Sequence, residues 1–283
     1  MTRWSGFLVC LLLASCREIT EPAYIEIQAI PVVQSGQGEN STSSDIKDAW
    51  IYLDDNLLGI YELPCRIPVT KTGKGRISVG AGVWMNALPT LRSPYVFYRF
   101  YEEDVQLNPG KTLKMNPAVK YKENIHLAYQ AGFDSPTGNT LEPGPQSDTL
   151  AGLTNDPARV FEGQGSFQSV LYRDEGFVEY QQAEPVDLPK SGAYVFLELD
   201  YLSSHPVDIG IRSYYPAAGT VYSKAVSLPA TASWQKVYIN LTSKVSTEVN
   251  AQNFRTVYSV HKESGTASLD FRMDNIRLIH FNP

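Results

Sequence analysis

Residues 192–211, GAYVFLELDYLSSHPVDIGI, contain the pattern that decides the fold. Within this stretch Tyr194–Tyr201 is rich in aromatic and aliphatic residues, and it predicts the longest strand of the chain. Asp208–Arg212 predicts a second strand that pairs with the first. Two strands this close in sequence indicate a β-sheet domain rather than a helical one.

Further strands are predicted on both sides of this stretch, about every 8–12 residues, with turn residues between them. In the second half of the chain they are 167–171, 177–180, 234–241, 256–261 and 268–281. In the first half they are 24–30, 49–53, 57–61, 76–79, 82–85, 95–100 and 105–107. Only Val245–Phe254 is expected to hold a helical turn. The sequence therefore predicts an all-β protein with two β-sandwich domains.

The domain boundary is predicted between the two groups of strands. From residue 124 to 156 the alternation fades and Gly, Pro, Thr, Asn and Asp dominate, which is unusual inside a compact domain. Gln34–Asp45, rich in Gly, Ser and Asn, predicts a flexible loop. The expected order is a signal peptide (1–15), a lipidated tether (16–22), an N-terminal β-sandwich (23–123), a loop-rich linker (124–156) and a C-terminal domain (157–283).

Composition excludes several classes of protein. Hydrophobic residues make up 43% and charged residues 19% of the 283 positions, so the chain has enough apolar residues for a packed core. The net charge of −6 argues against nucleic acid as a partner, because a phosphate backbone requires a basic surface. Three cysteines are too few for a disulfide framework.

The first sixteen residues predict a location. One arginine, an apolar run of about ten residues and small residues before Cys16 are typical of a secretory signal peptide. The apolar run is shorter than the roughly 20 residues that a membrane span needs. Leu13-Ala14-Ser15-Cys16 resembles the bacterial lipobox, in which the cysteine is acylated and becomes the first residue of the mature protein. Cys16 is therefore predicted to carry a lipid anchor, while Cys65 is expected to be a small buried apolar residue.

Four segments of the second half resemble a carbohydrate-binding-module jelly roll of the galactose-binding-like type. They are FEGQGSFQSVL (161–171), GAYVFLELDYLSSHPVDIGI, SWQKVYINLT (233–242) and LDFRMDNIRLIHF (269–281). The first half, with DAWIYLDDNLLGIYELPCRIPV (48–69), resembles the N-terminal sandwich of Bacteroidota cell-envelope lipoproteins. The resemblance implies a two-domain lipoprotein anchored in the outer membrane by lipid. The acidic residues Glu18 and Glu21 are compatible with a surface-export signal, so a cell-surface location is expected, with a periplasmic orientation as the alternative.

Metal and enzyme chemistry have little support in the sequence. The four histidines lack metal-binding spacing, and no G-x-S-x-G motif is present. The acidic runs 102–104 and 174–175 could suggest paired catalytic carboxylates, but such runs are expected to be solvated. No enzyme activity and no cofactor are therefore expected. Jelly rolls of this type often hold a structural Ca²⁺, for which Glu162 and Asp274 are the candidate ligands.

Aromatic residues are the other candidates for function. Exposed tyrosines can stack on sugar rings, and Tyr214 and Tyr215 are neighbours in an extended stretch, so one of them should face outward. In the segment 95–101, YVFYRFY, both faces of the expected strand would carry rings. Either the strand is buried on both sides, or one face contacts a partner. The candidate contact residues of this segment are Tyr95, Phe97, Tyr98, Phe100 and Tyr101.

One modification site and two functions are predicted. Asp148-Thr149-Leu150 resembles the acceptor motif of protein O-glycosylation in Bacteroidota, with Thr149 as the modified residue. The first predicted function is non-enzymatic. The protein is expected to be a lipid-anchored subunit of an outer-membrane protein complex that acts by protein–protein contact, with outer-membrane protein assembly or export as the expected process. The alternative is a surface glycan-binding lipoprotein that captures polysaccharide.

Overall fold

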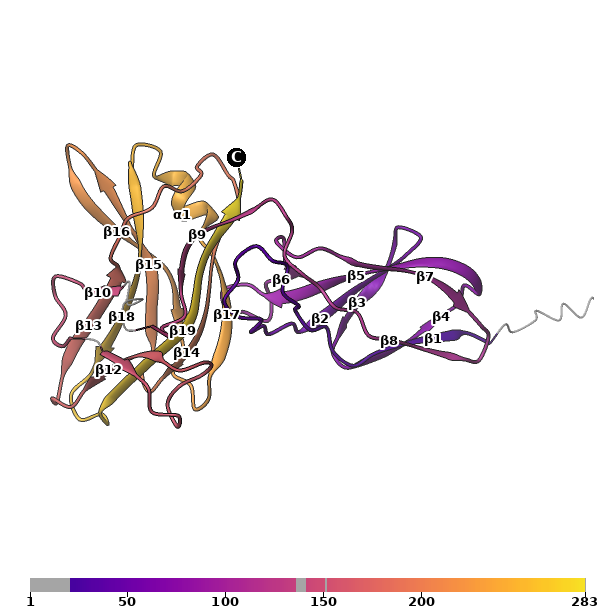
Figure 1. Ribbon diagram of the computed structural model, residues 1–283, viewed down its shortest axis with the longest axis horizontal. Helices are drawn as coiled ribbons and strands as arrows, with labels where there is room; N and C mark the ends of the chain where they lie inside the picture. Colours follow the sequence, from indigo (N-terminus) through magenta and orange to yellow (C-terminus); the bar gives the residue numbers. More distant parts are fainter. Residues whose placement is uncertain (1–20, 136–140, 151, 283) are drawn as a thin grey trace, which may run out of the picture.

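The computed structural model describes residues 21–135, 141–150 and 152–282, and these form two all-β units. The units follow one another along the long axis of the molecule, and the described chain begins at the end of the first unit that lies farthest from the second (Figure 1). The predicted signal peptide and Cys16 lie outside the described residues. The predicted all-β fold with two sandwiches is confirmed.

The first unit packs a three-stranded sheet against a five-stranded one. The smaller sheet has the order β4-β1-β8, with β4 at Cys65–Val69, β1 at Ala23–Ile27 and β8 at Thr112–Met115. The larger sheet consists of β2 (Asp48–Leu53), β3 (Asn56–Glu62), β5 (Gly73–Trp84), β6 (Arg92–Pro94) and β7 (Tyr101–Leu107). Alternate residues of β1 are buried between the sheets, as the period of two requires.

The strand pair predicted at 76–79 and 82–85 is wrong, because β5 runs through both segments without a bend. Its glycines serve close packing instead of a turn. A Cβ atom at Gly80 would lie 2.6 Å from Cε1 of Phe100, and one at Gly82 would lie 2.9 Å from the Trp50 ring. The two glycines let aromatic rings lie directly on the sheet.

The second unit is a jelly roll of two sheets. The outer sheet has the order β10-β13-β18-β15-β16, and the joint sheet has the order β11-β12-β19-β14-β17, with β9 also paired to β19. The outer sheet comprises β10 (Leu141–Pro143), β13 (Gly176–Gln182), β15 (Val207–Tyr215), β16 (Gly219–Leu228) and β18 (Asn253–Lys262). The joint sheet comprises β9 (Ile125–Ala131), β11 (Gly152–Thr154), β12 (Ser166–Leu171), β14 (Val195–Ser203), β17 (Gln235–Asn240) and β19 (Leu269–Phe281).

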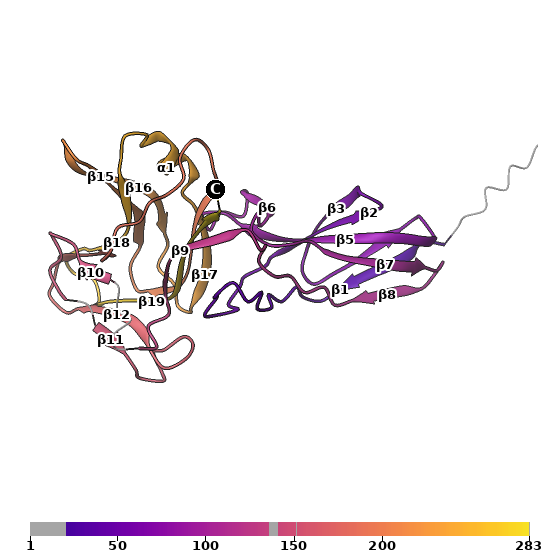
Figure 2. The same ribbon diagram turned by 45° about the horizontal axis from the view of Figure 1, so that its top comes forward.

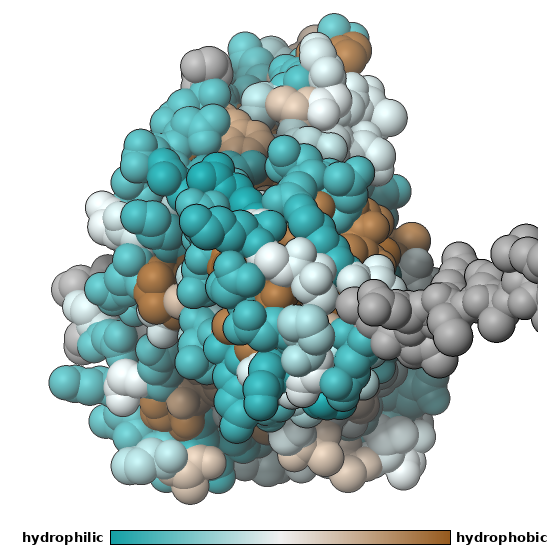
Figure 3. Space-filling view, turned by 90° about the vertical axis from the view of Figure 1, so that its right-hand side faces the viewer, coloured by the Kyte–Doolittle hydropathy of each residue, from teal (hydrophilic) through white to brown (hydrophobic). Residues whose placement is uncertain are grey.

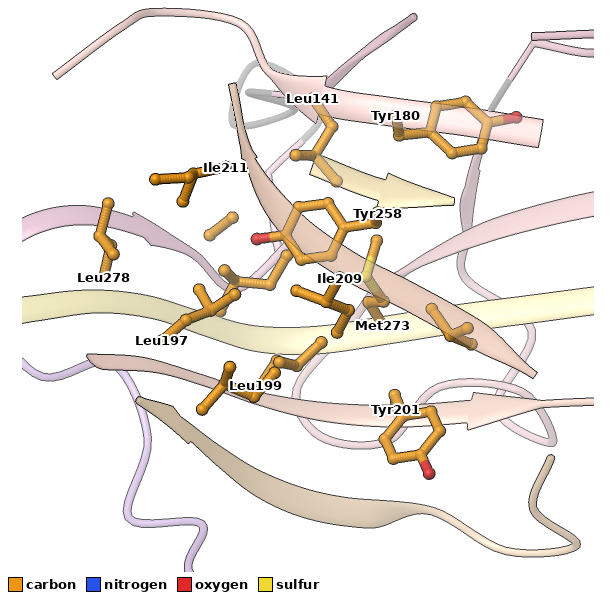
Figure 4. Close-up of a cluster of buried hydrophobic side chains, with 14 of the residues drawn as sticks. Leu141, Tyr180, Leu197, Leu199, Tyr201, Ile209, Ile211, Tyr258, Met273 and Leu278 are labelled. Atoms are coloured by element: carbon orange, nitrogen blue, oxygen red, sulfur yellow. The ribbon is translucent and has the colours of Figure 1, made fainter. Parts of the chain in front are cut away.

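Apolar side chains from both sheets fill the space between them. Leu197 and Leu199 of β14 and Leu278 of β19 meet Ile209 of β15 and Tyr258 of β18 (Figure 4). The strand predicted at 194–201 is thus confirmed as a central strand of the sandwich, but the prediction that it is the longest is wrong, because β14 has 9 residues and β19 has 13. The short helix α1 (Thr242–Thr247) begins before the predicted helical segment, Val245–Phe254, and overlaps only the first residues of that segment.

The loop-rich linker predicted at 124–156 is wrong, because three strands of the jelly roll lie within it. β9 pairs with the second half of β19, β10 with β13, and β11 with β12. The alternation Ile125, Leu127, Tyr129, Ala131 is a strand signal that marks β9. β10 and β11 are three residues each, too short for a periodic pattern to show.

The side chains of β19 change faces halfway along the strand. Leu269, Phe271 and Met273 point into the jelly-roll core, and after Asn275 the core positions become Ile276 and Leu278. Asn275 adopts a left-handed backbone conformation (φ 48°), which asparagine tolerates better than most residues. The shift turns Arg277 and Ile279 toward the first unit.

Aromatic side chains form the joint between the two units. Tyr95 and Phe97 of the first unit lie edge-on to Phe196 of β14, with ring centroids 5.5 and 5.8 Å apart. Beside them, the rings of Tyr98 and Tyr121 lie edge-on to each other, with their centroids 4.9 Å apart. All of these rings are buried, so one hydrophobic core continues from the first unit onto the outer face of the joint sheet.

The predicted strand at 95–100 is a turn, in which the Tyr98 amide donates to the carbonyl of Tyr95 at 3.1 Å. Of the two alternatives for this segment, burial on both sides holds for Tyr95, Phe97 and Tyr98. Their assignment as contacts to a separate partner is therefore wrong, because the chain's own second unit covers them. Phe100 is exposed and Tyr101 is half-buried.

A buried ion pair lies at the centre of the joint. The guanidinium of Arg277 and the carboxylate of Glu198, both fully buried, are 3.5 Å apart at their nearest atoms. Both belong to the second unit, but first-unit hydroxyls supply hydrogen bonds to both of them. Tyr95 and Tyr121 donate to Glu198 at 2.6 and 2.7 Å, and Arg277 donates to the Tyr121 oxygen at 3.0 Å.

The loop between β1 and β2 also contributes to the joint. In Figure 2 this segment, drawn in indigo, lies alongside β17. Arg277 donates to the Ser41 carbonyl, Ser43 donates to Asp200 at 2.8 Å, and the Asp45 amide donates to the Tyr238 hydroxyl at 3.1 Å. The prediction of a loop at Gln34–Asp45 is correct, but its small polar residues reach into the second unit. We call residues 34–45 the strap.

We expect Arg277→Met to lower the free energy of unfolding by about 3–5 kcal/mol, because it leaves a buried carboxylate without its counter-charge. Urea denaturation followed by tyrosine and tryptophan fluorescence measures the loss. Arg277→Lys keeps the charge and should lose less.

Arg76→Met is the matched control, because Arg76 and Asp104 form an exposed ion pair at 3.0 Å. Such pairs contribute little to the free energy of unfolding, because solvent screens them. Equal losses in Arg277→Met and Arg76→Met would contradict the central role of the buried pair.

Candidate functional site

The outward face of the outer sheet is the candidate site. The opposite sheet of the jelly roll is covered by the first unit, whereas the outer sheet faces away from the first unit (Figure 1). On β15, Ile209 and Ile211 point into the core, so Asp208, Arg212 and Tyr214 point outward. The same alternation on β13 and β18 turns polar side chains to this face.

These outward side chains form a continuous hydrogen-bonded network. Arg212 of β15 donates to Glu179 of β13 at 2.9 Å and also to Gln181. Gln181 in turn donates to Glu142 of β10 at 2.6 Å, and Arg255 of β18 pairs with the same carboxylate. Each side chain is held by its neighbours, so the network offers donors and acceptors in fixed positions.

Tyrosine rings lie beside the network. Tyr214 at the end of β15 is 40% exposed, and Tyr222 of β16 is exposed to a similar extent. Tyr222 lies over Gly210, where a Cβ atom would come within 2.8 Å of the ring. Partial burial raises the pKa of the Tyr222 hydroxyl, so this group stays neutral and can donate hydrogen bonds at physiological pH.

The face is hollowed at both ends. A groove of about 390 Å³ at one end is lined by Gln181, Arg212, Tyr214 and Arg255, among others. A second groove of about 370 Å³ lies at the other end, beside Asp208, Ser259 and His261. Asp208 and Tyr214 lie six residues apart on one strand, which spans about 20 Å.

The aromatic candidates of the second unit divide as expected, with one of the two tyrosines facing outward. Tyr214 lines the groove, whereas Tyr215 packs against the core and donates its hydroxyl to Glu248. Tyr215 therefore does not belong to the site. Arg212, Glu179 and Gln181 were not among the residues predicted from the sequence. The polar residues at alternate positions of β13 and β15 would have indicated them.

The candidate calcium ligands Glu162 and Asp274 lie near each other, at the strap. Asp274 accepts from Ser166 at 2.6 Å and from the Asn275 amide at 2.7 Å, while Glu162 accepts from Ser41 and from the Asn275 side chain at 2.7 and 3.1 Å. Within 21–135, 141–150 and 152–282, no three acidic, His or Cys side chains form a metal-binding group. Protein donors thus occupy these carboxylates, and calcium remains a prediction.

The acidic runs lie where solvated side chains are expected. Asp104 is exposed and pairs with Arg76, and Asp174 accepts from Ser264 and from the Gly265 amide. These bonds lower the pKa of both carboxyl groups. Neither run lies at the grooves of the outer sheet.

Two further candidate residues, Thr149 and Cys65, lie outside the network of the outer sheet. Thr149 is half-buried in a surface loop, and its carbonyl accepts from Ser147 and from the Tyr180 hydroxyl. Glycosylation of Thr149 remains a prediction. Cys65 is half-buried in β4, and burial raises the pKa of its thiol. In the part of the chain that the structure describes, no helix is long and apolar enough to cross a membrane.

Comparisons with known proteins find similarity in structure alone. No protein-family model and no curated sequence matches the chain. A xylan-binding domain of carbohydrate-binding module family 22 is 13% identical, covering 56% of this chain and 96% of its own, with a TM-score of 0.39. The C-terminal family 22 module of Clostridium thermocellum Xyn10B is 13% identical, covering 56% and 97%, with a TM-score of 0.40.

A third solved structure, described as a carbohydrate-binding module of the β-sandwich superfamily, is 11% identical. It covers 90% of this chain and 98% of its own, with a TM-score of 0.43. These three solved structures are carbohydrate-binding modules. At these identities and scores they give no information about which residues of this chain bind a ligand.

The titration of Asp274 provides a test of calcium binding. Burial raises the pKa of Asp274 to about 7 in the folded, metal-free protein, above the value near 4 of an unfolded aspartate. The folded state then binds more protons between about pH 4 and 7. In EDTA, this group should therefore stabilise the fold at low pH and lose that contribution, on the order of 4 kcal/mol, as pH rises through 7.

Urea denaturation across this pH range measures the effect, and Asp274→Asn should flatten the profile because an amide does not titrate. Calcium bound at Asp274 would favour the ionised form and reverse the slope. If millimolar Ca²⁺ leaves the wild-type profile unchanged, the calcium prediction is wrong.

Proposed function

We propose that this protein is a non-catalytic glycan-binding protein whose site is the outward face of the outer sheet. The observation that carries the proposal is the hydrogen-bonded network of Arg212, Glu179, Gln181 and Glu142 beside the exposed ring of Tyr214. This is the second of the two functions expected from the sequence. The first, a subunit of an outer-membrane complex, remains a prediction.

The chemistry of this face suits a sugar. A pyranose ring has an apolar face, which packs on an aromatic ring, and a rim of hydroxyl groups, which need both donors and acceptors. Arg212 and Arg255 present donors at the groove, and Glu142 presents a carboxylate acceptor beside them, while the buried side chains of Glu179 and Gln181 hold Arg212 in place. Because the network already holds these side chains in place, binding loses little side-chain entropy.

The shape of the face favours a chain over a single sugar. The two grooves lie at opposite ends of β15, with Gly210 between them. A face about 20 Å long has room for several linked rings. Both ends of the face are open, so an internal segment of a polysaccharide can lie along it.

The position of the jelly roll agrees with capture at a distance from an anchor. The described chain begins at the far end of the first unit (Figure 1). A lipid on Cys16, which remains a prediction, would then attach at that end. The glycan-binding face would be held away from the membrane by the length of the first unit.

The test is binding of the full chain to a glycan array, followed by calorimetric titration with the best soluble oligosaccharide. Tyr214→Ala should weaken binding about 3- to 10-fold through loss of ring packing. Arg212→Met should weaken it at least as much, because it removes the donors and leaves Glu179 and Gln181 without them.

Tyr172→Ala is the matched control, because Tyr172 is 82% exposed and lies in a turn away from the network. It should bind like the wild type, and both tyrosine variants should keep the wild-type melting temperature within a few degrees. Arg212→Met leaves the carboxylate of Glu179, whose side chain is 10% exposed, without its counter-charge, so it should melt at a lower temperature, and its binding is measured below that temperature. Retention of full affinity by Tyr214→Ala and Arg212→Met, or no binding on the array, would refute the proposal.

A further inference from the structure

A second cavity lies in the joint, on the side of the jelly roll that the glycan proposal does not use. We call it the joint cleft; it has a volume of about 660 Å³. Tyr98, Phe100 and Lys122 of the first unit line one wall, and Tyr194, Asn240 and Phe281 of the second unit line the other. The volume falls in the range of small-molecule sites, which are common at domain interfaces.

The lining of the joint cleft is mainly apolar and aromatic. Phe100 is 40% exposed and Tyr194 is 47% exposed, although large apolar side chains are usually covered in a folded protein. They belong to different units, so the cleft presents rings on opposite walls. The end-on view of the first unit is mostly hydrophilic, with hydrophobic side chains in small separate patches (Figure 3).

The charged and amide groups of the joint cleft are hydrogen-bond donors. Lys122 supplies an ammonium group, which lies 5.5 Å from the centre of the Phe281 ring. Asn240 uses its Oδ1 atom to accept from Thr242 at 2.9 Å, which leaves its NH₂ group to donate. Among the described residues, no carboxylate lines the cleft or lies within 4 Å of the Lys122 ammonium. This polar set is complementary to an anion.

The walls of the joint cleft are held in place before any ligand binds. Tyr95 lies at its base and donates to Glu198 at 2.6 Å, so the buried ion pair of the joint anchors one wall to the other. Phe281, which lines one wall, also packs against Phe97 of the first unit, with the two ring centroids 4.7 Å apart. A preformed cavity binds with little loss of conformational entropy.

We propose that the joint cleft binds a small amphipathic anion, with an aromatic or aliphatic body between Phe100 and Tyr194 and one acidic group at Lys122 and Asn240. The ring-lined walls bury the apolar body, and the ammonium pairs with the acid. A neutral sugar chain does not fit this site, because the cleft offers no acceptor set like that of the outer sheet. The proposal is independent of glycan binding.

The experiment uses the full chain and two probes, 8-anilinonaphthalene-1-sulfonate, read by its fluorescence, and dodecanoate, read by displacement of that dye. We expect saturable binding of both at one site. Lys122→Met should weaken both anions about tenfold, while the neutral analogue dodecanol should displace the dye from wild type and variant alike. Tyr194→Ser should weaken all three ligands, because it removes apolar contact rather than charge.

Two variants serve as controls. Lys74→Met makes the same change of charge at an exposed position at the far end of the first unit, and Tyr214→Ala alters the glycan face. Both should bind the dye like the wild type, and melting curves check that every variant is folded. The proposal is overturned if neither anion binds, if Lys122→Met and Tyr194→Ser bind like the wild type, or if Lys74→Met weakens binding equally.

Discussion

The pairing of Arg277 with Glu198 is the interaction on which the rest of the structure depends. Burying two charges is unfavourable unless their remaining hydrogen bonds are completed. Here the first unit supplies most of these bonds through Tyr95, Tyr121 and the carbonyl of Ser41, while Nε of Arg277 has no partner among the described residues. The two units therefore cannot separate without exposing the rings of the joint and leaving the buried ion pair without these partners. One continuous core across the joint follows from this requirement.

The arrangement of the binding surfaces follows from the same joint. Because the first unit covers the outer face of the joint sheet, only the outer sheet offers a broad free face in the jelly roll. The joint itself leaves an apolar cleft where Phe100 and Tyr194 approach each other without closing. The two cavities differ in chemistry: the outer face balances donors and acceptors, whereas the cleft has donors and aromatic rings. The two proposed sites thus suit ligands of different kinds.

Strand β19 contributes both to the core of the jelly roll and to the joint with the first unit. Its first half has one core face and one partly solvated face, whereas its second half is buried on both sides. The left-handed residue Asn275 separates the halves and hydrogen-bonds to both Glu162 and Asp200 through its side chain. Without this change of face, Arg277 would point into the apolar core rather than toward Glu198.

The sequence by itself determined the all-β class, the two sandwiches and the main strands of the jelly roll, because alternation of apolar residues is a local property. It also determined that one of Tyr214 and Tyr215 would face outward. Only the tertiary structure decided that Tyr95, Phe97 and Tyr98 are buried. It also decided that the strap hydrogen-bonds to the second unit and that β9 pairs with β19. These outcomes depend on contacts between residues far apart in the chain. A periodic pattern indicates which face of a strand is apolar, but it cannot indicate what covers the other face.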